Sequence, residues 1–235
     1  MKRYVLLFVY VLIVASAFAQ SNAPQSYEPD KSLQFFIGLG GGHNDYKNLN
    51  ASFDDAGLPT VGKYALLTTL EANIRHKNLL VGLTGNMGGS FKKQDEFNVF
   101  LLTFNPQVNI GYYIVNDKKF HLAPQVGIGA YSSSVNLEQK ENAGNFNDLL
   151  ANGNAININQ HVAALDFCLR FDLADYTKPK AGAASIKLGY KYGLSKHGWG
   201  IDATSNSTVE SSPEDRINQF YLQFLVGVAL QKPKH

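Results

Sequence analysis

Eight stretches of this 235-residue chain alternate between apolar residues and polar or small ones. In Ser185 to Leu194 (SIKLGYKYGL), for example, the aliphatic and aromatic residues occupy the even positions and the lysines and glycines the odd ones. This period of two predicts β-strands, because successive side chains of a strand point to opposite faces of its sheet. The alternating segments are Leu33–Gly42, Tyr64–Arg75, Asn78–Gly88, Phe97–Ile114, Phe120–Ser133, Gln160–Asp172, Ala183–Leu194 and Asn218–Leu230.

The connections between these segments alternate in length. The first, third, fifth and seventh connections are the longer ones at every step, and they include the long stretches 42–64, 134–159 and 195–217. In an up-and-down sheet these odd connections all lie at one end, and short turns opposite long loops are typical of outer-membrane barrels. Helical periodicity is poor, and its best candidate is a turn or two at Phe146 to Leu150.

The composition of the two rows indicates which face meets water. The polar rows carry Gly, Asn, Gln and Thr with few charges, whereas a face in bulk water usually carries many Lys and Glu. Repeated glycines in these rows also indicate crowding, as in the narrow interior of an eight-stranded barrel. A soluble lipocalin-type barrel would reverse the arrangement, and the pattern favours the membrane form. We therefore expect an all-β fold: an eight-stranded antiparallel up-and-down transmembrane β-barrel over residues 33–230.

The N-terminus has the pattern of a secretory signal peptide over residues 1–19. A positive start at Lys2 and Arg3 precedes an apolar run, which ends at the small-residue pattern Ala17-Phe18-Ala19. We expect a periplasmic linker over residues 20–32 and a short tail over residues 231–235. Cys168 is the only cysteine, so an internal disulfide is excluded, which fits a bacterial envelope protein. Acidic and basic residues nearly balance, which argues against a nucleic-acid partner.

Six charged side chains share the row that we assign to the interior: Glu71, Arg75, Asp166, Arg170, Lys187 and Lys191. A structural network of ion pairs is the favoured interpretation, because unpaired charges in a narrow lumen cost several kcal/mol each. The alternative is a ligand-binding or gated lumen with excess positive charge. Aromatic residues near the strand ends are candidates for interfacial girdles, namely Phe100, Tyr112, Tyr190, Tyr192, Trp199 and Phe220.

The sequence offers little support for catalysis. The histidines are scattered and show no metal-ligand spacing. Ser195, His197 and Asp202 could form a catalytic group in one loop, but such neighbours are common by chance. We expect no enzymatic activity, no catalytic residue, no metal and no cofactor.

The phrases FFIGLGGG, NPQVNIGYYI and APQVGIGAY, together with the strand pattern, resemble the small outer-membrane β-barrel families. These are the porin-like group, or outer membrane protein beta-barrel domain, with OmpA and OmpX types as relatives in architecture. The chain departs from them by ending on Gln231 to His235 rather than on an aromatic residue.

The resemblance implies a monomer in the outer membrane of a Gram-negative bacterium. It also implies contact with membrane lipid and lipopolysaccharide, and long loops that meet an envelope or extracellular protein. The expected function is a non-enzymatic structural or surface-interaction role. The alternatives are a small-solute conduit or secretion accessory that uses the basic lumen, and a lipid-modifying enzyme at the rim.

Overall fold

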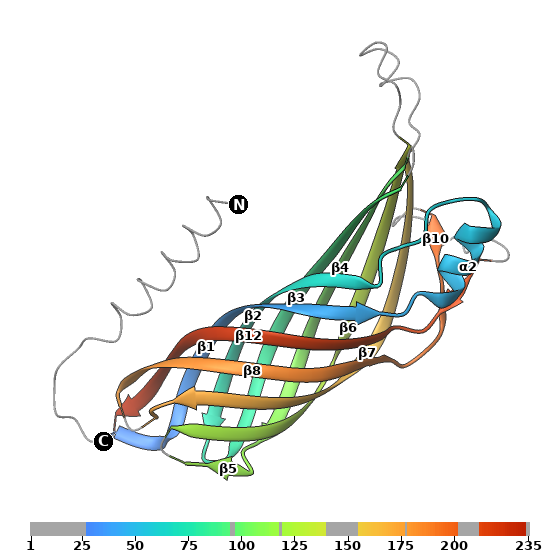
Figure 1. The fold of residues 1–235 in the computed structure, drawn as a ribbon. Coiled ribbons are helices and arrows are strands. Elements are labelled where there is room, and N and C mark those ends of the chain that lie inside the picture. Colours follow the sequence, from blue (N-terminus) through green and yellow to red (C-terminus); the bar gives the residue numbers. More distant parts are fainter. Residues whose placement is uncertain are drawn as a thin grey trace.

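The computed structural model of this protein describes residues 27–94, 97–117, 119–139, 155–176, 178–201 and 212–233. The expected signal peptide, residues 20–26 of the expected linker, and the helical candidate at 146–150 lie outside the described residues. Eight long strands make up most of the rest (Figure 1): β1 (Tyr27–Asn44), β2 (Tyr64–His76), β3 (Leu79–Gln94), β4 (Phe97–Tyr112), β6 (Phe120–Gln139), β7 (Ala155–Ala174), β8 (Lys180–Gly193) and β12 (Asn218–Pro233).

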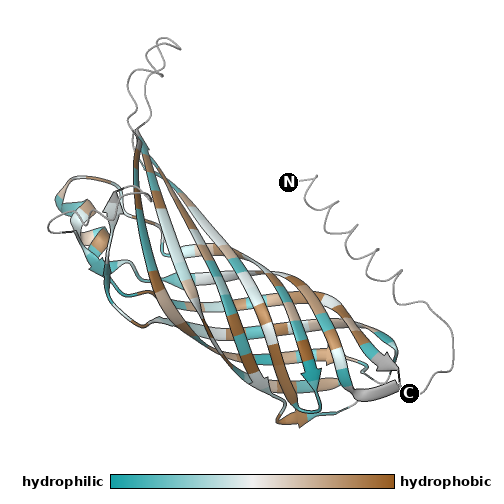
Figure 2. Ribbon diagram, turned by 180° about the vertical axis from the view of Figure 1, so that it is seen from behind, coloured by the Kyte–Doolittle hydropathy of each residue, from teal (hydrophilic) through white to brown (hydrophobic). Residues whose placement is uncertain are grey.

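The eight long strands close into a ring. Their order is β7-β8-β12-β1-β2-β3-β4-β6, and a further pairing of β6 with β7 completes the circle. Every neighbouring pair is antiparallel, and the first and last strands meet along a ladder from Tyr27–Pro233 to Asn44–Gln219. The expected fold class, an all-β eight-stranded antiparallel up-and-down barrel, is confirmed. Figure 2 shows the tilted strands wrapping around the barrel from behind.

Several strands are longer than the alternation indicated. β6 continues to Gln139 and β7 begins at Ala155, whereas their expected segments were 120–133 and 160–172. β3 and β4 remain paired up to Gln94 and Phe97, so the third connection, expected among the longer ones, is shorter than the alternation indicated. β1 begins at Tyr27, inside the expected linker, and β12 runs to Pro233, inside the expected tail.

The two ends of the barrel differ. At one end, which we call the turn end, lie the connections 77–78, 113–119 and 175–179, together with Tyr27 and Pro233 (Figure 1). The other end, the loop end, carries the helix α2 (Lys47–Asp55) and the two-residue strands β9 (His197–Gly198), β10 (Gly200–Ile201) and β11 (Glu214–Asp215). The short β5 (Val115–Asn116) belongs to the turn end. Among the described residues, no helix has the length and apolar character of a membrane span.

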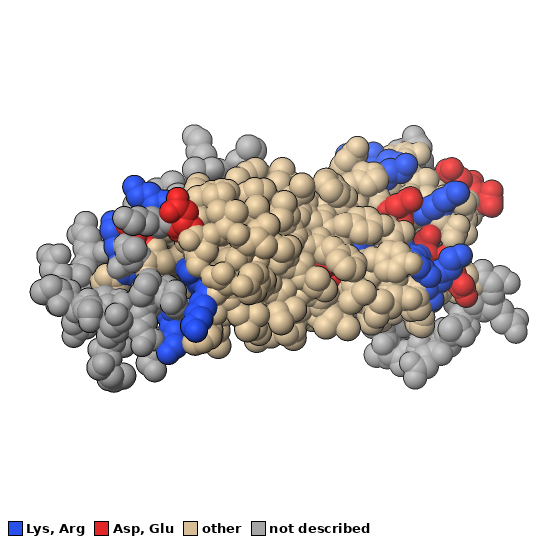
Figure 3. Space-filling model, turned by 90° about the horizontal axis from the view of Figure 1, so that it is seen from below, with Lys and Arg blue, Asp and Glu red and all other residues tan. Residues whose placement is uncertain are grey.

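The strand alternation separates an apolar outside from a polar inside. In β4 every second residue from Val99 to Gly111 is buried, and the residues between them are exposed. Leu83 on the outside is 62% exposed, whereas the adjacent Thr84 on the inside is 3% exposed. The exposed apolar side chains form a belt around the middle of the barrel, and on the face seen in Figure 3 most Lys, Arg, Asp and Glu residues gather at the two ends on either side of it.

Two glycines show how crowded the interior is. A Cβ atom added at Gly38 would lie 2.6 Å from Leu225 Cγ, and one added at Gly111 would lie 2.7 Å from Gln125 Cγ. Side chains of neighbouring strands therefore occupy the space that a larger residue would need. This agrees with the interior of an eight-stranded barrel, which is just wide enough for side chains to fill it.

Candidate functional site

Glu71 on β2 is the centre of a buried ion network in the lumen. Its carboxylate accepts hydrogen bonds from Arg170 on β7, from Lys187 on β8 at 2.7 Å, and from the Asn73 amide at 2.6 Å. The Thr84 hydroxyl on β3 is a fourth donor at 3.2 Å. Two of the other charges expected in the lumen, Arg170 and Lys187, therefore meet the carboxylate of Glu71 across the barrel.

A second group surrounds Lys191 nearer the loop end. The Lys191 ammonium lies 3.5 Å from Asp166 Oδ2, donates to Gln107 Oε1 at 3.0 Å, and also bonds the Asn105 amide oxygen. Asp166 in turn accepts from the Tyr221 hydroxyl at 2.9 Å and from Gln107 Nε2 at 2.7 Å. Lys191 and Asp166 thus form a pair whose hydrogen-bonding capacity is taken up by neutral side chains.

Asp172 is a lumen acid that the sequence analysis missed. It is fully buried, accepts from Arg170 Nε at 2.6 Å, and accepts from the Tyr113 hydroxyl at 2.6 Å. It has the same parity as Asp166 and Arg170, so the alternation contained the signal. Arg170 therefore pairs with two carboxylates, those of Glu71 and Asp172.

Arg75, expected in the same network, lies apart from it at the turn end. It is buried, and its guanidinium is 4.5 Å from the ring centroid of Tyr176 and 5.1 Å from that of Tyr113. It donates to the Lys77 carbonyl at 2.9 Å and to Asn116 Oδ1 at 2.8 Å. None of the ion pairs found among the described residues includes Arg75, so the structure separates it from the other five charges.

An apolar plug closes the lumen at the loop end. The α2 helix contributes Leu49, and with Tyr46 and Trp199 it packs on the inward side chains of the upper strands. The Asp215 carboxylate accepts from the backbone N–H groups of Asn48 and Leu49, both at 2.9 Å, and from Trp199 Nε1 at 3.2 Å. Asp215 therefore caps the first turn of α2, although more than 160 residues separate them in the chain.

Burial also perturbs the tyrosine of this plug. The Tyr46 hydroxyl lies 3.4 Å from Ser133 Oγ, and desolvation raises the pKa of Tyr46 to about 12. No periodicity in the first long connection pointed to α2, because only one residue of this helix, Leu49, is buried. The helix exists because Asp215 and the apolar strand ends hold it.

At the loop end, four neighbouring strands rise above the others as one continuous sheet, which we call the raised sheet. β3 pairs with β2 only up to Gly89 but with β4 up to Gln94. β7 pairs with β8 only from Ala164 onward, yet it pairs with β6 from Ala155. At about 3.4 Å per residue, the extra length of β7 is roughly 30 Å. Figure 1 shows these strands projecting beyond the level of α2.

Two strands of the raised sheet, β6 and β7, reverse the polarity of their two faces. On β6 the outward row changes from Val126 and Ile128 to Ser132, Ser134 and Asn136. The inward row changes in the opposite sense, from Gln125 and Gly127 to Val135 and Leu137, which are buried against the plug. The outward row of β7 agrees, since Asn157 accepts a hydrogen bond from Ser134 at 3.0 Å and His161 lies 2.8 Å from Ser132. On β6 and β7 the apolar belt therefore ends near Ile128, whereas the neighbouring β4 keeps Leu102 and Phe100 exposed on its outer side, in register with Ser134 and Asn136.

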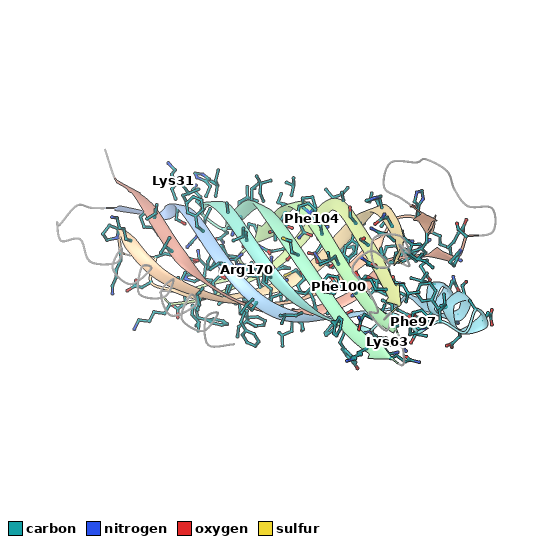
Figure 4. All side chains as sticks on the ribbon, turned by 90° about the horizontal axis from the view of Figure 1, so that it is seen from above. Lys31, Lys63, Phe97, Phe100, Phe104 and Arg170 are labelled. Atoms are coloured by element: carbon teal, nitrogen blue, oxygen red, sulfur yellow. The ribbon has the colours of Figure 1, made fainter. Side chains whose placement is uncertain are left out.

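The residues expected in aromatic girdles divide into two groups. Phe100, Tyr112, Tyr190 and Phe220 are on the outer surface, with exposed fractions of 41%, 54%, 39% and 52%. Tyr192 is half-buried beneath the Arg216 guanidinium, which lies 4.8 Å from its ring. Trp199 is a correction: it is 2% exposed and belongs to the plug, where Asp215 binds its indole N–H. Figure 4 shows Phe100 and Phe104 toward the loop end, with Arg170 nearer the middle.

The structure describes two of the three loop residues considered for catalysis. Ser195 and His197 are exposed, and His197 is in β9, while Asp202 lies outside the described residues. In the part of the chain that the structure describes, no three His, Cys, Asp or Glu residues converge as metal ligands.

A hollow of about 850 Å³ crosses the outside of β12, β1, β2, β3, β4 and β6. It lies where the small residues Ala72 and Gly85 face outward beside Leu70, Leu83 and Val108. We assign this hollow to the apolar belt and not to a catalytic pocket.

Comparison with known proteins gives structural likeness alone. No protein-family model and no curated protein matches this sequence. The solved structure of Ail, the attachment invasion locus protein of Yersinia pestis, covers 86% of this chain and 99% of its own, at 8% identity and a TM-score of 0.47. Neisserial surface protein A covers 85% and 97%, at 11% identity and a TM-score of 0.44. The outer membrane protease OmpT from Escherichia coli covers 90% and 100%, at 12% identity and a TM-score of 0.36.

Proposed function

We propose that this chain is a monomeric, non-enzymatic barrel of the Gram-negative outer membrane, and that its working surface is the raised sheet with the plug beneath it. The apolar belt supports the membrane placement. Contact of so wide an apolar surface with water is unfavourable, and its side chains, such as Leu70 and Ile74, are both 64% exposed. A closed ring of strands is also the one β arrangement that pairs its whole backbone within lipid.

The filled lumen argues against a conduit. Glu71, Arg170 and Lys187 occupy its middle, the Lys191 and Asp166 pair lies above them, and the plug covers the loop end. Each of these charged groups is almost fully buried. The ion network therefore fills the lumen and leaves no open channel through it.

The observation that carries the proposal is the reversal of polarity on β6 and β7 of the raised sheet. These two strands turn neutral polar groups outward while their other face packs on the plug, which suits a rigid platform that stands in water. Its neutral Ser and Asn side chains can donate and accept hydrogen bonds without the cost of desolvating a charge. Such a surface suits contact with another envelope or extracellular protein.

The rim below the raised sheet suits lipopolysaccharide. The exposed side chains of Lys63, immediately before β2, and of Lys93, near the end of β3, lie at the loop end directly beyond the exposed Tyr64 and Phe91. Cations immediately beyond an aromatic and aliphatic surface match a lipid with phosphate groups above its acyl chains. Figure 4 shows Lys63 at this end, near Phe97.

Cysteine labelling tests the placement, because the native Cys168 is buried. In intact cells, a membrane-impermeant maleimide should label Ser134→Cys on the raised sheet and leave Lys178→Cys at the turn end unlabelled. Lys178→Cys should react once the outer membrane is permeabilised. Labelling of both variants in intact cells would refute the orientation.

Planar-bilayer recording tests the closed lumen. We expect no steady conductance from the wild-type barrel. A steady current that falls when Lys187 is replaced by Gln would favour the conduit instead.

The platform itself is tested by placing charge on its outer face. Ser134→Lys with Asn157→Lys should abolish cell-to-cell or cell-to-surface adhesion that depends on the displayed barrel, without changing its heat-dependent gel mobility. Asp55→Lys on the exposed side of α2 is the matched control. Adhesion that is equal in all three proteins would refute this role for the raised sheet.

A further inference from the structure

The turn end of the barrel carries an excess of positive charge among the side chains that the structure describes. Its exposed lysines are Lys77, Lys119, Lys178 and Lys180, and the acids of its connections are Asp117 and Asp175. The exposed charges of the loop end are mixed: Lys47, Lys63, Lys93 and Lys196, with Asp45, Asp54, Asp55, Glu138 and Glu214. On the face that Figure 3 draws, blue atoms predominate at the left, turn end, whereas blue and red are mixed at the right. The two ends therefore attract partners of different charge.

Three of the turn-end lysines have no acidic partner within the described part of the chain. Lys178 lies 3.8 Å from Asp175 Oδ2, so part of its charge is offset. None of the ion pairs found among the described residues includes Lys77, Lys119 or Lys180. We call these three residues the basic collar. Their charges are available to an anion that approaches this end of the barrel.

The basic collar is spread around the barrel and does not form a single patch. Lys77 lies in the turn between β2 and β3, Lys119 directly precedes β6, and Lys180 begins β8. In the ring of strands, β8 and β3 lie on opposite sides. A partner that docks on one side would therefore miss part of the collar, whereas a membrane surface surrounds the barrel and meets every lysine.

The collar also lies directly at the edge of the apolar belt. Lys119 is followed by Phe120, which is 39% exposed and pairs in register with Leu173, which is 55% exposed. Lys77 is two residues before Leu79, which is 40% exposed. A lysine can lay its apolar stem along such a surface while its ammonium group stays in the polar layer beyond. The ammonium groups therefore lie at the level where lipid headgroups meet acyl chains.

The backbone of Lys77 is an independent sign that its side chain has a role. Among the described residues, Lys77 is the one non-glycine residue with a positive φ, at 54°. Glycine and asparagine adopt this left-handed region more readily than lysine does. The turn is held by Arg75 Nε, which donates to the Lys77 carbonyl at 2.9 Å, and by the Tyr113 N–H, which donates to the Asn78 carbonyl at 2.8 Å. The fold therefore keeps a lysine at the tip of this turn, where a smaller residue would fit the backbone better.

From these features we propose that the basic collar binds the headgroups of anionic phospholipids in the leaflet at the turn end. Each lysine attracts the phosphate of a lipid whose acyl chains lie against the belt residues beside it. The contact is electrostatic and needs no pocket, so it selects lipids by charge. The inference rests on the membrane placement proposed above and adds to it a preference for one class of lipid.

Electron spin resonance of spin-labelled lipids around the barrel measures this preference. In phosphatidylcholine vesicles, the wild-type protein should bind spin-labelled phosphatidylglycerol more tightly than spin-labelled phosphatidylcholine with the same acyl chains. Lys77→Gln/Lys119→Gln should lower the ratio of the two association constants about threefold or more, because one lysine at an anionic surface favours binding about fivefold. Lys47→Gln/Lys196→Gln is the matched control. It removes two charges at the loop end, on α2 and beside β9, and should lower the ratio much less.

Lys119→Gln/Lys180→Gln keeps the test valid if a change at Lys77 disturbs its turn. Equal losses in the collar variants and the control would overturn the proposal, as would a preference that persists in about 1 M salt, where exposed charges are screened. Binding of the barrel to isolated cell wall that is lost in the collar variants, without a lipid preference, would assign the lysines to the cell wall and also overturn it. A barrel that inserts into vesicles but shows no preference would refute the collar alone, whereas failure to insert would refute the membrane placement as well.

Discussion

Replacing Glu71 by Gln tests whether the lumen network holds the barrel together. The substitution keeps the shape of the side chain and removes the charge that Arg170 and Lys187 share. Arg170 retains Asp172 at 2.6 Å, but Lys187 has no other carboxylate within ion-pair distance among the described residues. One buried ammonium is therefore left uncompensated.

Breaking a buried ion pair by removing one partner costs about 3 to 5 kcal/mol. We expect Glu71→Gln to lower the free energy of unfolding by that amount. The double variant Glu71→Gln/Lys187→Met removes both charges, so it should recover at least half of the loss. Thr84→Val, which keeps the charge of Glu71 but removes the hydroxyl that donates to Glu71 and accepts from Asn109, should cost about 1 to 3 kcal/mol.

Denaturant unfolding of the refolded barrel in phospholipid vesicles gives these free energies. Trp199, the single tryptophan, reports on the plug by fluorescence, and heat-dependent gel mobility reports on the closed barrel. A loss below about 1 kcal/mol for Glu71→Gln would refute the reasoning. So would a double variant that is as unstable as the sum of the two single ones.

Three further predictions concern the surface and the plug. Val126→Arg should destabilise the barrel by about 2 to 4 kcal/mol in vesicle unfolding, and Ser134→Arg on the same outward row should change it by less than about 0.5 kcal/mol, because the apolar row of β6 ends between them. Equal effects would contradict the reversal of polarity on β6. Asp215→Ala should cost about 1 kcal/mol of local stability by uncapping α2, seen as faster proteolysis of residues 45–63 with unchanged gel mobility; unchanged proteolysis would refute the role of Asp215. The pKa of Tyr46 is about 12 in the folded plug and near 10 when the side chain is exposed, so its contribution to stability is complete below pH 10 and is lost as the pH rises to 12. Trp199 fluorescence should therefore change more between pH 10 and pH 12 in the wild-type protein than in Tyr46→Phe. Equal curves for the two proteins would contradict this prediction.

The barrel could be predicted from the sequence because each strand carries its own evidence. The row Ile186, Leu188 and Tyr190 had to face lipid or a core, and the sparse charge of the opposite row decided between them. The same parity placed Lys187 and Lys191 inside, where the structure brings them to Glu71 and Asp166.

The loop end could not be predicted in the same way, because its structure depends on distant partners. Trp199 is an aromatic residue near a strand end, as expected of a girdle residue. The Asp215 carboxylate and the plug nevertheless hold its side chain inside the barrel. The raised sheet was missed for a different reason. Beyond Ser133 the apolar row changes face, so a search for one unbroken alternation ends where β6 in fact continues.

The charges that meet at Glu71 also restrict how the chain can assemble. Arg170 and Lys187 are 99 and 116 residues away from it in sequence, so their contacts have a very high contact order. These ion pairs cannot form in any hairpin of the barrel, because β2 meets β7 and β8 only across the finished lumen. Until the seam between β1 and β12 closes, the interior charges must remain hydrated. Expulsion of that water and closure of the seam are then a single late event, and half a barrel lacks the ion pairs of Glu71 that stabilise the closed one.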